Sequence, residues 1–87
     1  MALNFPNESR SYDATEGSVR FWGHDGALEV SFCVEERALR HIAPGTSNDE
    51  AASLRIFDAN RERIFKAARQ VYSGTRKGSY VLNASDF

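Results

Sequence analysis

The sequence has 87 residues, of which 41% are hydrophobic and 26% are charged, and its formal net charge is −1. This composition excludes collagen-like, low-complexity and wholly disordered proteins, and the length predicts one domain over residues 1–87 with a single small core. No apolar segment approaches the roughly 18 residues of a membrane span, and no secretory signal is visible. With one cysteine and no internal disulfide, the protein is expected in the reducing cytoplasm, without membrane contact.

Asp25-Gly26 is the strongest local structural signal in the sequence. An Asp-Gly pair between segments of alternating polarity predicts a two-residue hairpin turn of type I′, because both central residues of that turn need positive φ. In this register Phe21 faces Val30, and the apolar residues within 28–34 lie on one side of their strand.

A second hairpin is predicted at Glu16-Gly17, although the sequence leaves its turn type open. Its register sets Tyr12 against Phe21 and Asp13 against Arg20, and the second of these is a cross-strand ion pair. Both hairpins place their apolar residues on the same face, an agreement that a shift of one residue would destroy. The first third of the chain therefore predicts a meander of three strands.

The other face of this meander is polar except for Trp22. Two interpretations remain open from the sequence. Either Phe5 and Pro6, or the flank of the last strand, cover the indole, or Trp22 is an exposed anchor for a partner, since aromatic side chains concentrate binding energy at interfaces. The candidate partner-binding face comprises Arg20, Trp22, His24 and Glu29.

The second half of the chain predicts helices followed by a strand. Residues 35–42 form a short helix, and the capping-box pattern of Ser47 and Glu50 begins a long helix that runs from residue 48 or 49 to residue 72 or 73. Residues 78–83 predict the last strand. The order is β-β-β-α-α-β, an α+β fold in which one long helix packs across the apolar face of a small antiparallel sheet. Whether the last strand joins the first or the third strand is left open.

Arg61 departs from the polarity pattern of the long helix, because it projects near the centre of the apolar stripe, between Phe57 and Phe65. An unpaired guanidinium is too costly to bury, so Arg61 must be paired, hydrogen-bonded or extended past the edge of the stripe. We expect a buried or anchoring charge with an acidic or carbonyl partner. The alternative is an anion site between helix and sheet.

Positive charge gathers in residues 61–77, where six basic residues accompany a single acidic one. Such a stripe is usually the solvated face of a helix, and the near-neutral total argues against a dedicated polyanion binder. It is also the first sign of contact with nucleic-acid phosphates. The candidate phosphate-contacting residues are Arg63, Lys66, Arg69, Arg76 and Lys77.

No arrangement of residues predicts catalysis. In the predicted register Cys33 and His24 are on the order of 20 Å apart, which excludes a nucleophile–base pair. His41 follows the third strand, but a pair of His41 with Cys33 has no visible third member. His24, Asp25 and Glu29 lack a metal-ligand spacing, and no phosphate loop is present. We expect no metal, no cofactor and no enzymatic activity.

Short motifs along the chain resemble those of a known family. They are Phe5-Pro6-Asn7, Ser11-Tyr12-Asp13-Ala14, Val19 through Gly26, Val34-Glu35-Glu36 through Leu39, Phe57 through Arg61 to Ile64, and Gly78-Ser79-Tyr80. Their order over nearly the whole chain is similar to that of the family called domain of unknown function 1488. The resemblance implies a small bacterial α+β domain without an established activity, and it supplies no catalytic residues.

Two functions of different classes remain. We expect a non-catalytic protein-interaction or regulatory module, with an unknown protein partner or a second copy of the chain bound at the Trp22 face or at a sheet edge. The alternative is a nucleic-acid-binding accessory domain that uses residues 61–77. Salt discriminates between the two, because phosphate contacts weaken steeply as the salt concentration rises.

Overall fold

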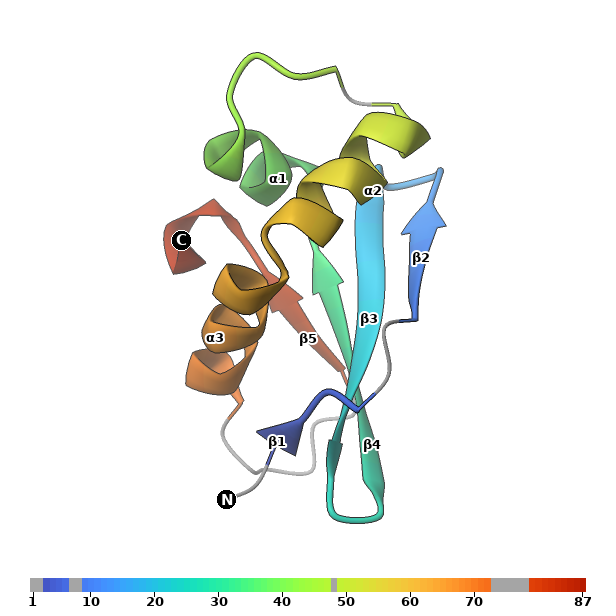
Figure 1. Ribbon diagram of the computed structural model, residues 1–87, viewed down its shortest axis with the longest axis vertical. Helices are drawn as coiled ribbons and strands as arrows, with labels where there is room; N and C mark the ends of the chain where they lie inside the picture. Colours follow the sequence, from blue (N-terminus) through green and yellow to red (C-terminus); the bar gives the residue numbers. More distant parts are fainter. Residues whose placement is uncertain (1–2, 7–8, 48, 73–78) are drawn as a thin grey trace.

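The computed structural model describes residues 3–6, 9–47, 49–72 and 79–87. Within these residues it confirms the α+β class: five strands form one sheet, which three α-helices and a 3₁₀ turn accompany (Figure 1). The elements in chain order are β1 (Leu3–Asn4), β2 (Arg10–Asp13), β3 (Ser18–Asp25), β4 (Leu28–Val34), α1 (Glu36–Ile42), α2 (Glu50–Ala59), α3 (Arg61–Val71), β5 (Ser79–Leu82) and the 3₁₀ turn η1 (Ala84–Asp86).

β3 is the central strand of the sheet. It pairs antiparallel with β4 along one edge, and with β1 and β2 at different points along the other edge. β5 lies beside β4 and runs parallel to it, which answers the question that the sequence left open about the last strand. A parallel neighbour needs a long crossover, and the segment that contains α1, α2 and α3 provides it. The sheet is therefore mostly antiparallel, with one parallel pair.

The predicted register of the β3–β4 hairpin is wrong by two residues. Asp25 pairs with Leu28, so the turn consists of Gly26 and Ala27 rather than of Asp25 and Gly26. Gly26 has φ +61°, and no non-glycine residue in the described part of the chain has positive φ. Positive φ at the first turn position alone is the pattern of a type II′ turn. Asp25 therefore does not need the left-handed conformation that the predicted type I′ turn would require of it. Because the shift is two residues, every side chain keeps its predicted face.

The β2–β3 connection also differs from its predicted register by two residues. In place of the Glu16-Gly17 turn, residues 14–17 form a four-residue connection. Oδ1 of Asp13 accepts hydrogen bonds from the backbone N–H groups of Thr15 and Glu16, at 3.0 and 3.3 Å, and so stabilises a local turn that starts the connection. Arg20 no longer sits directly opposite Asp13, but its guanidinium reaches the carboxylate diagonally at 3.8 Å.

The helical stretch predicted across the sheet covers residues 50–71 and is divided at Asn60 into α2 and α3. Asn60 has φ −126°, and its side-chain Nδ2 donates to the carbonyl of Ile56 at 2.8 Å, at the point where α2 leaves carbonyls free. The N-cap of α2 is Asp49 rather than the predicted Ser47. Oδ1 of Asp49 accepts from the N–H of Ala52 at 2.8 Å, and Ser47 supports the cap by donating to Oδ2 at 3.0 Å.

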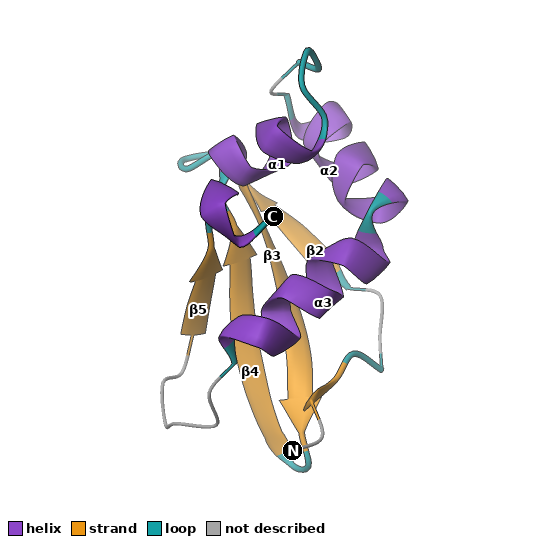
Figure 2. Ribbon diagram, turned by 90° about the vertical axis from the view of Figure 1, so that its left-hand side faces the viewer, coloured by secondary structure: helices purple, strands orange, loops and turns teal. Residues whose placement is uncertain are grey.

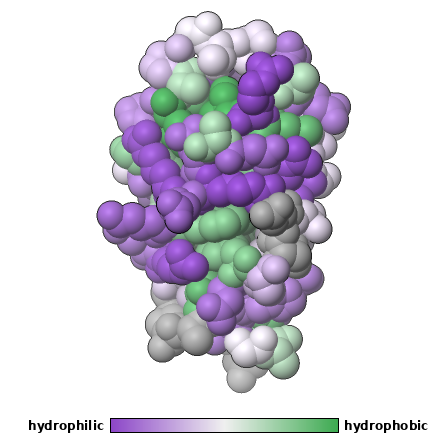
Figure 3. Space-filling model, viewed as in Figure 1, coloured by the Kyte–Doolittle hydropathy of each residue, from purple (hydrophilic) through white to green (hydrophobic). Residues whose placement is uncertain are grey.

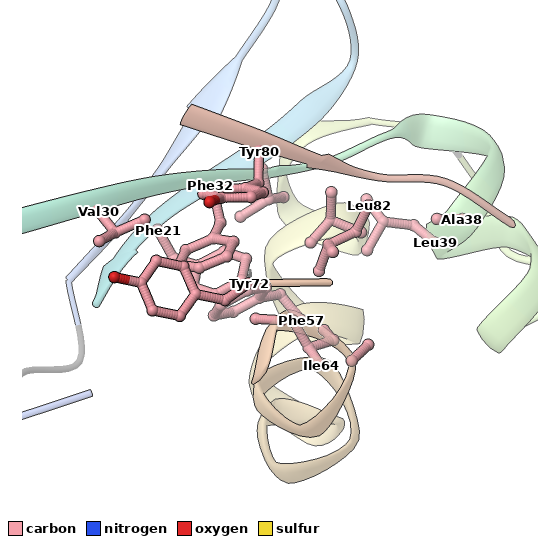
Figure 4. Packing of buried hydrophobic residues seen from close by; sticks show 14 of the residues in the cluster. Phe21, Val30, Phe32, Ala38, Leu39, Phe57, Ile64, Tyr72, Tyr80 and Leu82 are labelled. Carbon is pink, nitrogen blue, oxygen red and sulfur yellow. The ribbon is translucent and has the colours of Figure 1, made fainter. Parts of the chain in front are cut away.

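The three helices lie on the same side of the sheet (Figure 2). Between helices and sheet lies one cluster of buried apolar side chains (Figure 4). Phe21 of β3 and Phe57 of α2, with ring centroids 5.2 Å apart, join the two layers at the centre of the cluster. Phe32 of β4 stacks on Tyr80 of β5 at 5.5 Å, which anchors the parallel strand to the same core.

The sequence does not predict β1. This strand pairs with His24 and Asp25 at the end of β3. At the neighbouring Gly23, a Cβ atom would lie 2.8 Å from the ring of Phe5 and 3.2 Å from the backbone oxygen of Asn4. Glycine is therefore needed here for close approach and not for an unusual φ. Phe5 stacks on Phe65 of α3 with centroids 4.2 Å apart, so the N-terminal segment closes the helix side of the core.

Candidate functional site

The described helices leave one face of the sheet uncovered, and we call it the open face (Figure 2). Because side chains alternate along a strand, the residues between the core positions point towards this face. On β2 to β5 they are Ser11, Asp13, Ser18, Arg20, Trp22, His24, Glu29, Ser31, Cys33, Ser79 and Val81.

The four residues of the predicted partner-binding face lie together on the open face. Arg20, Trp22 and His24 alternate along β3, and Glu29 pairs with His24 across to β4. Trp22 is half-buried and lies outside the core cluster. The structure therefore places charged side chains of both signs around one indole.

Phe5 does not cover Trp22, which corrects part of one of the two interpretations left open by the sequence. The ring of Phe5 packs on the helix side of the sheet, against Phe65 and Phe21, whereas Trp22 points to the other side. Across β4, the β5 residue in the same row of the sheet as Trp22 is Ser79.

Two adjoining hollows indent the open face where β4 leads into α1. Their volumes are about 370 and 460 Å³, and Glu16, Ser18, Cys33 and Val81 line both, so we call them together the open-face hollow. Val81 is 53% exposed, whereas Ser18 is only 2% exposed. The Oγ atom of Ser18 is buried and has no hydrogen-bond partner among the residues that the structure describes.

Charged side chains of both signs border the open-face hollow. Glu35, Glu36 and Arg37 lie at the start of α1, and Arg20 lies on β3. Glu36 extends over Gly17, where a Cβ atom would lie 2.9 Å from Oε2 of the glutamate. Gly17 has φ +70°, so glycine suits this position both for its backbone and for the space that it leaves. The hollow thus offers partners for positive and negative groups of one ligand.

The candidate phosphate-contacting residues Arg63, Lys66 and Arg69 are exposed on α3, and the surface over this helix is strongly hydrophilic (at left in Figure 3). Arg76 and Lys77, the other two candidates, fall outside the described residues. Trp22 lies on the face of the sheet opposite to α3, so the structure does not bring the basic side chains and the indole together.

Two of these arginines are also engaged within the protein. The guanidinium of Arg63 lies 5.9 Å from the centre of the Phe87 ring, and that of Arg69 lies 5.1 Å from the centre of the Phe5 ring. Nε of Arg69 donates to the carbonyl of Leu3 at 3.3 Å. Both side chains therefore hold the chain ends against α3, whatever else they contact.

Arg61 pairs with an acidic residue. Its Nη2 donates to Oδ1 of Asp58 at 2.8 Å, and its guanidinium lies 5.0 Å from the centre of the Phe57 ring. Asp58 also accepts hydrogen bonds from Arg10 of β2, whose Nε and Nη2 reach the two carboxylate oxygens at 3.0 and 2.8 Å. One carboxylate thus holds two guanidinium groups and ties β2 to α2.

This arrangement shifts two pKa values. The hydrogen bond from Arg10 is the main cause that lowers the pKa of Asp58, and the same bond raises the pKa of Arg10. Neither residue is predicted from the sequence as a site residue. The three-residue spacing of Asp58 and Arg61 on a helix is a signal for the first, but nothing local points to Arg10, 48 positions away from Asp58.

Cys33 and His24 share the open face without approaching each other. Cys33 pairs with Arg20 and His24 pairs with Glu29, whereas the predicted register sets them against Ser18 and Ala27. Four residues along β3 separate the two pairs, about 13 Å at the rise of a strand. Within the described ranges, no three His, Cys, Asp or Glu side chains gather as metal ligands, and no helix has the length and apolarity of a membrane span.

Comparison with known proteins identifies a matching family and a similar crystal structure. A family model described as protein of unknown function, DUF1488, matches residues 3–82. The chain belongs to this family. A DUF1488 protein of unknown function from Shewanella loihica PV-4 has a similar crystal structure, with a TM-score of 0.79 and 17% sequence identity over 92% of this chain and 90% of that chain. No curated protein matches the chain.

Membership in DUF1488 agrees with the resemblance of the short motifs along the sequence. At 17% identity, the likeness to the Shewanella protein supports the fold alone. The DUF1488 description names no activity, so the candidate site rests on the geometry of the open face and of α3.

Proposed function

We propose that this protein is a non-catalytic, cytoplasmic protein-interaction module whose open face binds a partner protein. The observation that carries the proposal is the position of Trp22, an indole outside the core on the face that the described helices leave uncovered. Val81, 53% exposed on the edge strand β5, adds an apolar side chain to that face. Aromatic side chains in such positions carry much of the binding energy at protein interfaces.

The charges of the open face define the partner that fits it. Asp13 and Glu29 outnumber the single guanidinium of Arg20 on this face, and Arg20 already contacts Asp13 at 3.8 Å. Glu16 adds a carboxylate beside Asp13 in the lining of the hollow. A complementary protein surface presents an apolar side chain among lysines or arginines. The cytoplasmic location rests on the lone cysteine, since disulfide-free chains of this size are typical of reducing compartments.

Site-specific cross-linking in the cells that make the protein tests this proposal. A photoreactive residue replaces Glu29 on the open face, and in the matched control it replaces Glu62 on the exposed side of α3. We expect a protein cross-link from position 29 alone, to a partner that mass spectrometry identifies. Equal cross-linking from position 62, or adducts that consist of a second copy of the chain, would contradict a distinct partner at the open face.

The identified partner is then titrated with the purified protein. Trp22 is the single tryptophan of the chain, so its fluorescence reports directly on the open face. Binding there is expected to shift the emission to shorter wavelength as the indole leaves water. Calorimetry with Trp22→Ala is expected to show a loss of affinity of about tenfold or more, as for an interface hot spot. Unchanged emission at saturation would place the contact elsewhere.

A nucleic-acid role is the second candidate, and the charge of α3 favours it. The helix contains four basic residues and one acidic residue. An amide NMR titration with mixed short RNA and DNA, at low and moderate salt, tests it. Shifts confined to α3 that vanish as salt rises would support phosphate contact. A flat spectrum would exclude it.

A further inference from the structure

We propose that two copies of this chain associate through the outer edge of β5, with the two β5 strands antiparallel about a two-fold axis at Tyr80. The sheets of the two copies then continue into one another. The inference does not rest on the proposed function, because it concerns the chain alone and needs no other protein.

The outer edge of β5 is a border of the sheet. β5 pairs with β4 on one side, and among the described residues no strand pairs with its other side (Figure 2). The unpaired N–H and C=O groups along such an edge are a template for a further strand. The sheet can therefore be extended at β5.

The pairing with β4 fixes which backbone groups of β5 point outwards. The carbonyl of Leu82 accepts a hydrogen bond from the N–H of Glu35, directly after β4, at 3.1 Å, so Leu82 directs its backbone groups towards β4. The backbone groups of successive residues alternate between the two edges of a strand. Ser79 and Val81 therefore direct theirs to the outer edge.

The open stretch of backbone ends at Val81. The next residue with outward groups is Asn83, and it uses both of them within η1. Its N–H donates to Oδ2 of Asp86 at 2.8 Å, and its carbonyl accepts from the N–H of Asp86 at 3.0 Å. In the described part of the chain, the groups that this edge offers to another strand are thus those of Ser79 and Val81.

These groups complement themselves in one register. When Ser79 lies opposite Val81 of a second copy, the two residues can exchange both backbone hydrogen bonds, as in a hydrogen-bonded antiparallel pair. The two-fold axis at Tyr80 repeats this exchange, so each outward N–H meets a carbonyl of the other copy. Ser79 and Val81 share the open face, so the register keeps every side chain on its side of the sheet. A two-fold interface requires such self-complementarity.

The side chains of β5 also suit a second copy. The strand contains neither a charged residue nor a proline, with which proteins commonly protect their edges, whereas β2 at the opposite border contains Arg10 and Asp13. A two-fold axis brings like residues together, so charges within the strand would repel their copies. Val81 is 53% exposed, and contact with the second copy would cover it.

The concentration dependence of the purified chain tests the association. Two strands of four residues bury less than the roughly 1,200 Å² of a standard interface, so we expect a dissociation constant between about 10 µM and 1 mM in sedimentation equilibrium. Amide NMR shifts that depend on concentration should centre on Ser79 and Val81. In a mixture of labelled and unlabelled chains, nuclear Overhauser effects should join the Val81 methyl groups to Ser79 of the other copy. A chain that stays monomeric to about 1 mM, or shifts centred elsewhere, would overturn the proposal.

Two variants of Val81 show whether the edge causes the association. Val81→Pro removes an outward N–H that β4 does not use, and Val81→Glu adds negative charge next to Glu16 and Glu35, which line the hollow beside it. Each is expected to weaken the dimer about tenfold or more, since one removes a hydrogen bond and the other opposes like charges. The matched change Ser11→Glu, on β2 at the other border, should leave it unchanged.

Thermal unfolding verifies that each variant is folded. If Val81→Pro is not, Val81→Glu decides, because it is a change at an exposed position. An unchanged dissociation constant in Val81→Glu would overturn the proposal.

Cross-linking from position 81, in the cells that make the protein, separates a second copy from another occupant of the edge. We expect a photoreactive residue there to form adducts with a second copy of the chain. Adducts with a different protein alone would assign the edge to another chain and overturn the proposal. Position 29 on β4 reports on the open face instead, so the failure of one proposal is distinguishable from the failure of the other.

Discussion

The hydroxyl of Tyr72 donates a 2.5 Å hydrogen bond to Oδ2 of Asp25. Tyr72 is the C-cap residue of α3 and Asp25 is the last residue of β3, so this bond joins the helix layer to the tip of the hairpin. It also accounts for the observed turn. Asp25 stays within the strand with its carboxylate towards α3, and the turn begins one residue later, at Gly26.

Tyr72 is expected to make the protein sensitive to alkaline pH. The hydrogen bond to Asp25 is the main cause that raises the pKa of Tyr72 to about 12. A tyrosine whose folded pKa exceeds its unfolded value of about 10 stabilises the fold fully below pH 10, and this contribution disappears as the pH rises towards 12. Tyr72→Phe should therefore lower the urea midpoint at neutral pH, and its difference from the wild type should shrink between pH 10 and 12.

Asp25→Asn serves as the comparison for this measurement. It keeps an acceptor of similar shape next to the hydroxyl but removes the negative charge, so the pKa of Tyr72 should be raised less. The alkaline loss of stability should then still begin near pH 10, but it should be smaller than in the wild type and end at a lower pH. Parallel titration curves for the wild type and both variants would show that the Tyr72–Asp25 bond has no role in alkaline unfolding.

Gly23→Ala is expected to displace β1. The added methyl group would lie 2.8 Å from the Phe5 ring and 3.2 Å from the backbone oxygen of Asn4, and the backbone atom cannot rotate away. Overpacking of this kind costs about 1–3 kcal/mol of unfolding free energy. Urea unfolding measures the loss, and NMR contacts between the Phe5 and Phe65 rings should weaken.

The double variant Gly23→Ala with Phe5→Ala separates this steric effect from a backbone effect. Removing the Phe5 ring relieves part of the clash, so the two losses should sum to more than the loss in the double variant. Additive losses would mean that the alanine acts on the strand itself and not on the packing of β1.

The periodicity of the sequence predicts the face of the sheet on which a side chain lies better than it predicts the residue paired with it on the next strand. Alternation alone places Arg20, Trp22 and His24 on one face of β3, and the structure agrees. It does not decide which residues form a turn, because a register shift of two preserves every face. That choice depends on Gly26 having positive φ, and on the distant contact of Asp25 with Tyr72, which no local pattern encodes.

Other features cannot be predicted from the sequence, because they depend on contacts between residues that are far apart in the chain. The glycine that admits β1 has an ordinary backbone, so only its neighbours in the fold, the ring of Phe5 and the backbone of Asn4, explain Gly23. The open-face hollow joins the end of β4 with the connection over residues 14–17, and its lining becomes visible only when Ser18 and Cys33 are placed side by side on the sheet. Arg10 meets Asp58 only through the packing of α2 against β2.

Asp58→Asn is expected to weaken the fold in an acid-dependent way. The pKa of Asp58 is lowered, chiefly by Arg10, so its carboxylate stabilises the folded state above the unfolded pKa of about 4 and loses this effect as the pH falls further. Since the carboxylate is 41% exposed and screened by solvent, the loss at neutral pH should be no more than about 1 kcal/mol.

Urea unfolding from neutral to acidic pH measures the effect of this carboxylate. The variant's deficit should be largest at neutral pH and vanish in acid, and Glu62→Gln on the exposed side of α3 should leave the neutral-pH stability unchanged. In a double-mutant cycle, Arg10→Gln and Asp58→Asn should be non-additive. A deficit that stays constant with pH would assign the loss to packing rather than to the ion pairs.

Ser18→Ala is expected to stabilise the isolated protein. The Oγ of Ser18 is buried without a partner in the described residues, so its removal should raise the unfolding free energy by about 1 kcal/mol, at the lower end of the cost of an unsatisfied group. Ser11→Ala, an exposed change on the same face, should stay within about 0.5 kcal/mol of the wild type. Urea unfolding of the three proteins gives both values. A destabilised Ser18→Ala would mean instead that the hydroxyl is already satisfied within the fold, or that its removal leaves the site poorly packed.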